Sequence, residues 1–162
     1  MKSVLVVYYS RSGGTRIIAE EIASVLKGDI EEIEDTTGRK GPLGWLRAGK
    51  DAGDKSLTKL KQIKKDPAEY DLVIVGSPVW NGTVSTPIRT YLTEQKDNIK
   101  ATAFWVSGYK TDNNAITEMT EIIKGEPIAT LRLLGKEEIQ AGQYKEKLDA
   151  FLSKIKKTNI KV

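Results

Sequence analysis

The sequence predicts an α/β domain in which helices cover both faces of a mostly parallel sheet. Two observations predict this class. Short apolar runs alternate with amphipathic stretches along the chain, and the central runs are nearly continuous, as expected of strands buried on both faces. The 162 residues, 39% apolar and 30% charged, are enough for one compact domain over 1–162. We therefore expect a single three-layer, doubly wound domain.

Five segments are predicted to be strands. Residues 3–9 (SVLVVYY), 72–75 (LVIV) and 101–106 (ATAFWV) are almost entirely apolar and should form the centre of the sheet. Residues 29–33 and 128–134 alternate polar with apolar side chains, which indicates strands nearer its edges.

Apolar side chains at helical spacing predict the helices that connect these strands. Four regular helices are expected over 15–26, 86–95, 113–124 and 144–156. The connection over 36–67 is irregular. A short helix should begin there at Pro42 and carry Trp45, and an amphipathic piece with Leu57, Leu60 and Ile63 should follow it.

The composition excludes several kinds of chemistry. The chain has no cysteine and no histidine, which excludes disulfides, thiolate catalysis, histidine general bases and Cys/His metal sites. Reactivity must then come from hydroxyls, carboxylates, lysines or tyrosines, from an oxygen-ligated metal, or from a bound cofactor, which would need no catalytic side chain. No apolar run is long enough to span a membrane, so we expect no membrane insertion and a cytoplasmic location.

The segment that follows the first strand has the features of a phosphate cradle. Its glycines let backbone N–H groups turn inward, its hydroxyls add donors, and the next helix presents its N-terminus to an anion. An ordinary strand-to-helix turn, with Ser12 or Thr15 as the N-cap, is the alternative. The candidate residues are Ser10, Arg11, Ser12, Gly13, Gly14 and Thr15.

This segment is neither a Walker loop nor a GxGxxG fingerprint. Together with the strand before it and the helix after it, it resembles the N-terminal pattern of the flavodoxin family at Val6, Val7, Tyr8, Ser10, Gly13, Thr15, Ala19 and Ile22. The resemblance implies a flavodoxin-like fold of the short-chain type, with five strands in the order 2-1-3-4-5. It also implies that the cradle holds the phosphate of FMN. Gly14 departs from the family, in which asparagine is frequent.

A second loop, over 76–83, follows the central strand. We expect an exposed Trp80 to stack on an aromatic ligand, and the Asn81-Gly82 pair to form a turn with positive φ. A tryptophan packed against neighbouring loops is the alternative. The resemblance implies that this loop, with Pro78, Val79, Trp80, Asn81 and Gly82, brackets the flavin ring. It also implies that the Asn81-Gly82 peptide inverts on one-electron reduction, which Gly82 should make easy.

A third loop follows the fourth strand, and its aromatic residue is a candidate for the opposite face of the ring. The resemblance implies that backbone N–H groups of this loop contact the pyrimidine edge of the flavin. The candidate residues are Ser107, Gly108 and Tyr109.

Positive charge is concentrated in one segment, which begins at Arg39 and ends at Lys65. It holds nine basic and two acidic residues, whereas the whole chain has 26 basic and 22 acidic residues. The segment is expected to dock acidic redox partner proteins, with a solvated, lysine-rich helix as the alternative. Nucleic-acid binding is disfavoured because no aromatic residues are interleaved with the charges.

The function expected from these features is that of an FMN-binding electron carrier, which passes single electrons between redox partners. An FMN-dependent NAD(P)H:quinone or flavin oxidoreductase on the same fold is the alternative. A phosphorelay receiver domain is excluded by its residues. It needs an acceptor aspartate where this chain has Gly76-Ser77, and acidic residues where it has Tyr9-Ser10.

Overall fold

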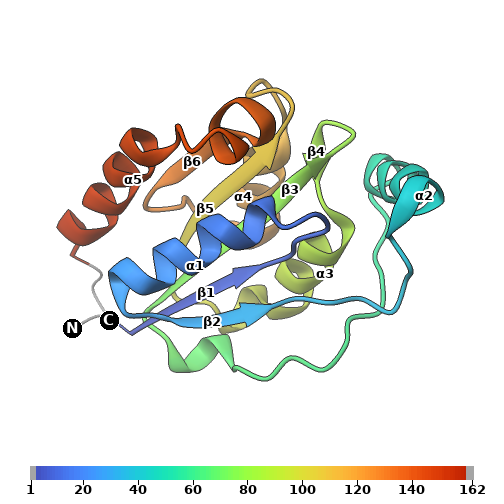
Figure 1. Ribbon diagram of the computed structural model, residues 1–162. Helices are drawn as coiled ribbons and strands as arrows, with labels where there is room; N and C mark the ends of the chain where they lie inside the picture. The colour runs from blue at the N-terminus through green and yellow to red at the C-terminus, as the bar shows by residue number, and fades with distance from the viewer. Residues whose placement is uncertain (1–2, 160–162) are drawn as a thin grey trace.

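The computed structural model describes residues 3–159, which form a central sheet between layers of helices (Figure 1). Five strands are parallel in the order β2-β1-β3-β5-β6, which is the predicted order when parallel strands alone are counted. The apolar strands lie at the centre and the alternating ones at the two edges, as predicted. The parallel strands are β1 (Val4–Tyr8), β2 (Asp29–Glu32), β3 (Leu72–Trp80), β5 (Thr102–Gly108) and β6 (Thr130–Leu134).

Each face of the sheet has its own core, because successive side chains of a strand point to opposite faces. Val4 and Val6 of β1 pack in the core under α1 (Gly14–Leu26) and α5 (Lys145–Lys157). Leu5 and Val7 pack in the core under α3 (Thr86–Gln95) and α4 (Ala115–Ile123). The remaining helix, α2 (Gly41–Gly53), lies to the right in Figure 1, on the side toward which the β3 hairpin points.

The predicted third strand is too short, because β3 continues through Trp80. Gly76, Ser77 and Pro78, predicted as a loop, pair with residues 105–107 of β5. A Cβ on Gly76 would lie 1.9 Å from the Trp105 ring, so glycine is required there for close packing and not for a turn. The end of β3 then pairs antiparallel with an unpredicted strand, β4 (Thr83–Val84).

The amphipathic piece after α2 is not helical. Its backbone is extended and runs antiparallel to the chain after β2, with the Lys61 amide 2.7 Å from the Glu34 carbonyl oxygen and the Thr36 amide 3.0 Å from that of Lys59. Leu60 and Ile63 pack against the second core, whereas Leu57 is exposed. A spacing of three residues favours a helix, and the hydrogen bonds to the chain after β2 override that preference.

Three further segments complete the described chain. They are the short helical turns Pro67–Glu69 and Lys96–Asn98, and a π-helical turn, Gly135–Gln140, that follows β6. No helix within residues 3–159 combines the length and the apolar character needed to cross a bilayer.

Candidate functional site

The segment between β1 and α1 is a compact turn organised by one hydroxyl. Ser10 Oγ accepts hydrogen bonds from the amides of Gly13 (3.0 Å) and Arg16 (3.4 Å). Gly13 is the N-cap of α1, with a φ of 100° and no side-chain cap, so neither Ser12 nor Thr15 caps the helix. Within the described chain the amides of Gly14 and Thr15 have no acceptor, which leaves two donors at the positive end of the helix.

A buried hydrogen bond joins the first and third predicted loops. Thr15 Oγ1 lies 3.0 Å from Ser107 Oγ, and both side chains are buried. Residues that are 92 positions apart in the sequence are thereby fixed at one end of the sheet. The carboxyl ends of β1 and β5 therefore contribute to one site, as expected where strand order reverses.

The second predicted loop is a tight hairpin. Trp80 pairs with Thr83, so the loop consists of Asn81 (φ 50°) and Gly82 (φ 76°). Two central residues with positive φ define a type I′ turn, for which Asn-Gly is a favoured pair. Inverting the peptide between them would convert the turn to type II′, which requires glycine at the position of Asn81. Gly82 alone therefore does not make that inversion easy.

Trp80 is buried rather than exposed, which corrects the sequence-based expectation. Its side chain is 8% exposed and packs edge-on against Tyr9, with ring centroids 5.3 Å apart and an interplanar angle of 89°. Burial, reinforced by the negative charge of Asp35, raises the pKa of Tyr9 to about 12, so the phenol is neutral in this packing. Trp80 still lines the cavities described below.

The Arg39 side chain lies over the ring of Trp80. Its guanidinium carbon lies 5.4 Å from the ring centroid, and it donates to Asp35 (Nε, 2.8 Å) and Asp51 (Nη1, 2.8 Å). Burial alone would lower the pKa of Arg39, but the hydrogen bonds that it donates to these carboxylates raise the pKa above its ordinary value. Arg39 is 3% exposed and cannot belong to the docking surface predicted over 39–65.

A cavity of about 560 Å³ brings the three predicted segments together. Tyr109, which is 82% exposed, lies at its margin. Of the other candidate residues, Ser10 lines a neighbouring polar cavity, and Asn81 and Gly82 line an apolar one. The candidates that line the 560 Å³ cavity are Arg11, Ser12, Gly13, Gly14, Thr15, Pro78, Val79, Trp80, Ser107, Gly108 and Tyr109.

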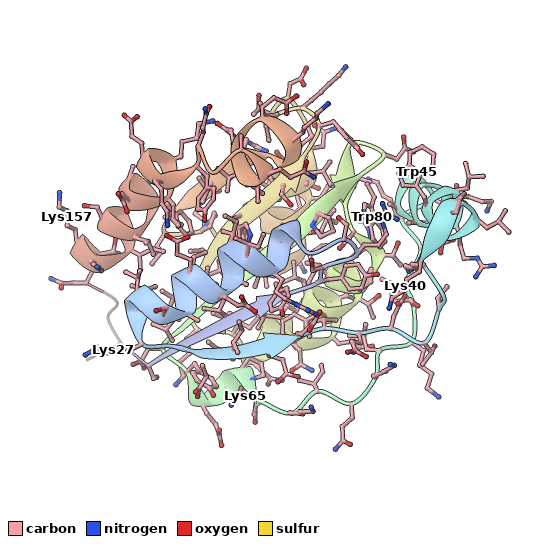
Figure 2. All side chains as sticks on the ribbon, in the orientation of Figure 1. Lys27, Lys40, Trp45, Lys65, Trp80 and Lys157 are labelled. Atoms are coloured by element: carbon pink, nitrogen blue, oxygen red, sulfur yellow. The ribbon has the colours of Figure 1, made fainter. Side chains whose placement is uncertain are left out.

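The same cavity contains residues that sequence reasoning did not assign to the site. Trp45 reaches it from α2, and Lys136 and Ile139 reach it from the π-helical turn after β6. In Figure 2, Trp45 and Trp80 lie close together on the side of the molecule where α2 packs. The sequence predicts Trp45 on a short helix, but it does not show that this helix packs beside the cavity.

A buried polar network joins the hairpin formed by β3 and β4 to α3 and α4. Glu118 of α4 accepts hydrogen bonds from the Thr83 hydroxyl and from Arg89 Nη2 (2.7 Å), and Arg89 Nη2 also donates to Thr83 Oγ1 (2.9 Å). Burial would raise the pKa of Glu118, but the hydrogen bonds from Thr83 and Arg89 and the charge of Arg89 lower it. Because Thr83 follows Gly82, the network fixes one arm of the turn.

The chain is similar to solved structures of flavin proteins. It is 27% identical to a flavoprotein from Lactobacillus acidophilus NCFM, solved in complex with FMN, with a TM-score of 0.65 over 87% of this chain and 98% of that one. A flavodoxin from Fusobacterium nucleatum, bound to flavin mononucleotide, is 13% identical, with a TM-score of 0.63 over 97% and 98%. An NADH:FMN oxidoreductase in its apo form is 16% identical, with a TM-score of 0.52 over 94% and 89%.

No curated protein matches the sequence closely enough to count as a relative. The family model described as flavodoxin, however, matches residues 3–125, which run from β1 past α4 and contain all three predicted site segments. The chain therefore belongs to the flavodoxin family.

Proposed function

We propose that this protein binds FMN in the 560 Å³ cavity and acts as an electron-transfer protein. The observation that carries the proposal is that three segments distant in sequence line one cavity, whose lining combines free backbone amides and cationic side chains with aromatic rings. Bound FMN would supply the redox chemistry, and the protein would supply binding, orientation and electrostatics.

The hydrogen-bond donors in the lining of the cavity fit a phosphate group. The amides of Gly14 and Thr15 lie at the N-terminus of α1, a favourable position for an anion. Arg11 and Lys136 also line the cavity, and neither forms an ion pair with any described carboxylate. Val79, Trp80 and Tyr109 also line the cavity and supply apolar and aromatic surface for a flavin ring.

The first test is a titration of the cofactor-free protein with FMN and, separately, with riboflavin, followed by flavin and tryptophan fluorescence. We expect saturable 1:1 binding of FMN and at least about tenfold weaker binding of riboflavin, because riboflavin lacks the phosphate. Absence of saturable FMN binding would overturn the proposal. Equal affinity for the two ligands would overturn the role of the cradle.

A second test separates an electron carrier from an FMN-dependent oxidoreductase. A carrier is expected to pass electrons to a redox protein and to consume NADH or NADPH negligibly when a quinone is supplied. Sustained consumption of either nicotinamide by the FMN-loaded protein would replace the carrier proposal with the oxidoreductase one.

We further propose that the carrier docks an acidic redox partner through the exposed cations of the crossover. Four basic residues there form no ion pair with a carboxylate in the part of the chain that the structure describes: Lys40, Arg47, Lys59 and Lys64. By contrast, Lys50 and Lys61 are paired with Asp54 and Glu34. An interface of this type should be salt-sensitive.

The docking test replaces those four residues with glutamine and measures electron transfer to a small acidic ferredoxin. The rate should fall severalfold and lose most of its salt dependence, with FMN affinity unchanged. A control variant replaces three lysines elsewhere, Lys154, Lys156 and Lys157, with glutamine, since Lys157 lies at the opposite end of the molecule from Lys40 (Figure 2). Equal rates for both variants would contradict docking on the crossover.

A further inference from the structure

A polar cavity of about 850 Å³ adjoins the cavity proposed for FMN. Its lining comes from the loop after β1, the chain after β2 and the first half of α2, and we call it the crossover cavity. The two cavities share Arg11, Ser12 and Gly13. Gly14 and Thr15, whose free amides are proposed to bind the FMN phosphate, line the first cavity alone. The crossover cavity is therefore separate from those donors.

Every carboxylate in the lining of the crossover cavity is already paired with a cation of the same lining. The three ion pairs are Arg16–Glu32 (2.6 Å), Lys61–Glu34 (2.6 Å) and Arg39–Asp35 (2.8 Å). Because each pair is neutral as a whole, the net charge of the cavity is set by the cations outside these pairs.

Three cations of the lining form no ion pair with a carboxylate of residues 3–159. They are Arg11 from the loop after β1, Lys40 from the chain that enters α2 (Figure 2), and Arg47 from α2 itself. Arg47 donates a hydrogen bond to the Gly38 carbonyl oxygen (3.3 Å), which leaves its charge uncompensated. Six basic and three acidic side chains line the cavity, so their net charge is +3.

Backbone donors add to these cations. The amides of Thr37 and Gly38 form no hydrogen bond within the described chain, and both residues line the cavity. The chain on either side is held in place, because the Thr36 amide donates to the Lys59 carbonyl oxygen (3.0 Å) and the Thr37 hydroxyl lies 3.3 Å from that of Thr58. Free amides beside unpaired cations are suitable donors for phosphate oxygens. Three cations from separate segments suit a ligand with more than one phosphate group.

We propose that the crossover cavity binds a small molecule with two or more phosphate groups, at a site separate from that of FMN. The size fits, since 850 Å³ lies within the range of about 300–1,000 Å³ typical of small-molecule sites. The inference rests on the proposed function only in taking the first cavity as the FMN site. Lys40 and Arg47 also belong to the four cations proposed for docking, so a bound diphosphate would leave that surface less positive.

The test measures ADP binding to the FMN-loaded protein by calorimetry, without divalent cations. We expect 1:1 binding that weakens as salt is added, and at least about tenfold weaker binding of AMP, which lacks the second phosphate. Absence of ADP binding, equal affinities for ADP and AMP, or competition between ADP and FMN would overturn the inference. Failure of FMN itself to bind would overturn the proposed function, and ADP binding to the cofactor-free protein would then test the crossover cavity.

Inorganic pyrophosphate distinguishes two sources of the phosphate groups. An affinity for pyrophosphate equal to or above that for ADP would support a site that recognises phosphate groups alone. Tighter binding of ADP would support a nucleotide site, in which the remaining volume of the cavity holds the nucleoside.

Two charge-matched double variants make the test specific. Lys40→Gln with Arg47→Gln removes two cations of the lining, so ADP affinity should fall at least about tenfold, with FMN affinity unchanged. The control is Lys59→Gln with Lys64→Gln, which removes the same charge from the same crossover at residues outside the lining. ADP affinity should then change by about twofold or less. Equal losses of ADP affinity in the two double variants would show a response to net charge alone and would contradict the assignment.

Discussion

The guanidinium of Arg39 lies over the indole ring of Trp80, 5.4 Å from its centroid, while the same group donates to carboxylates of two separate segments. Asp35 follows β2 and Asp51 belongs to α2, so one buried cation ties the crossover and α2 to an aromatic residue of the site. Gly44 lets α2 lie close to the backbone of Arg39, because a Cβ there would lie 2.3 Å from the Arg39 carbonyl carbon. The arrangement explains why α2 is held beside the cavity although it packs on little of the sheet.

Replacing Arg39 should therefore destabilise the fold and loosen the site. Arg39→Gln leaves Asp35 and Asp51 without their cation, and breaking a buried pair costs about 3–5 kcal/mol. Urea denaturation should show this loss, and tryptophan fluorescence should shift to longer wavelength as Trp80 becomes hydrated. The control is Arg47→Gln, whose side chain bonds only the Gly38 carbonyl at 3.3 Å and should change stability by about 0.5 kcal/mol or less. Equal losses of unfolding free energy in Arg39→Gln and Arg47→Gln would show that the ion pairs of Arg39 add little to stability.

The strands and helices with clear periodicity were predictable because local pattern and burial agree there. Residues 86–95 and the apolar central strands are examples, since the helix forms its backbone hydrogen bonds within itself and the central strands are apolar on both faces. The extended segment after α2 was not predictable, because its conformation depends on bonds to Glu34 and Thr36 far away in the sequence. The end of β3 was predicted too early for the same reason. Gly76 and Pro78 normally indicate a turn, and the need for glycine at position 76 becomes clear only from the Trp105 ring that packs against it.

The candidate site also has features that could be predicted from the sequence and features that could not. Its backbone conformation, in the glycine turn before α1 and in the Asn81-Gly82 turn, could be predicted from short motifs with known conformational preferences. Its side-chain packing could not be predicted. Whether Trp80 is exposed depends on Arg39, and whether Trp45 reaches the cavity depends on how α2 packs.

The Asn81-Gly82 turn leads to a prediction for the FMN-loaded protein. Inversion of the peptide would place Asn81 in a conformation that is essentially restricted to glycine, at a cost of about 1–3 kcal/mol. Asn81→Gly removes that cost. In an anaerobic reductive titration, the separation between the first and second reduction potentials should widen by about 60 mV for each ~1.4 kcal/mol of strain removed. An unchanged separation would show that this peptide does not invert on reduction.

The hydroxyl that organises the cradle should matter for a phosphate but not for a flavin ring. Ser10→Ala removes the acceptor shared by the amides of Gly13 and Arg16, so the loop loses the bonds that hold its shape. FMN affinity should fall about tenfold, equivalent to about 1.4 kcal/mol, whereas riboflavin affinity should change little. Equal losses for both ligands would point to a general disruption of the site instead.

The Glu118 network leads to a prediction of how stability depends on pH. Its hydrogen bonds lower the pKa of Glu118 below the ordinary 4.5, so the carboxylate binds its proton less readily in the folded than in the unfolded protein. The stabilisation is therefore fully present above about pH 4.5 and is lost as the pH falls through the lower, folded-state value. Glu118→Gln should lower the free energy of unfolding by about 2–3 kcal/mol near pH 7, because Arg89 stays buried without its anion.

Urea denaturation at several pH values should show a smaller loss of stability on acidification for this variant than for the wild type. The control is Glu121→Gln, at an exposed position of the same helix, which should leave the pH dependence unchanged. If the free energy of unfolding depended on pH equally in the wild type and in Glu118→Gln, Glu118 would have the same pKa in the folded and the unfolded protein.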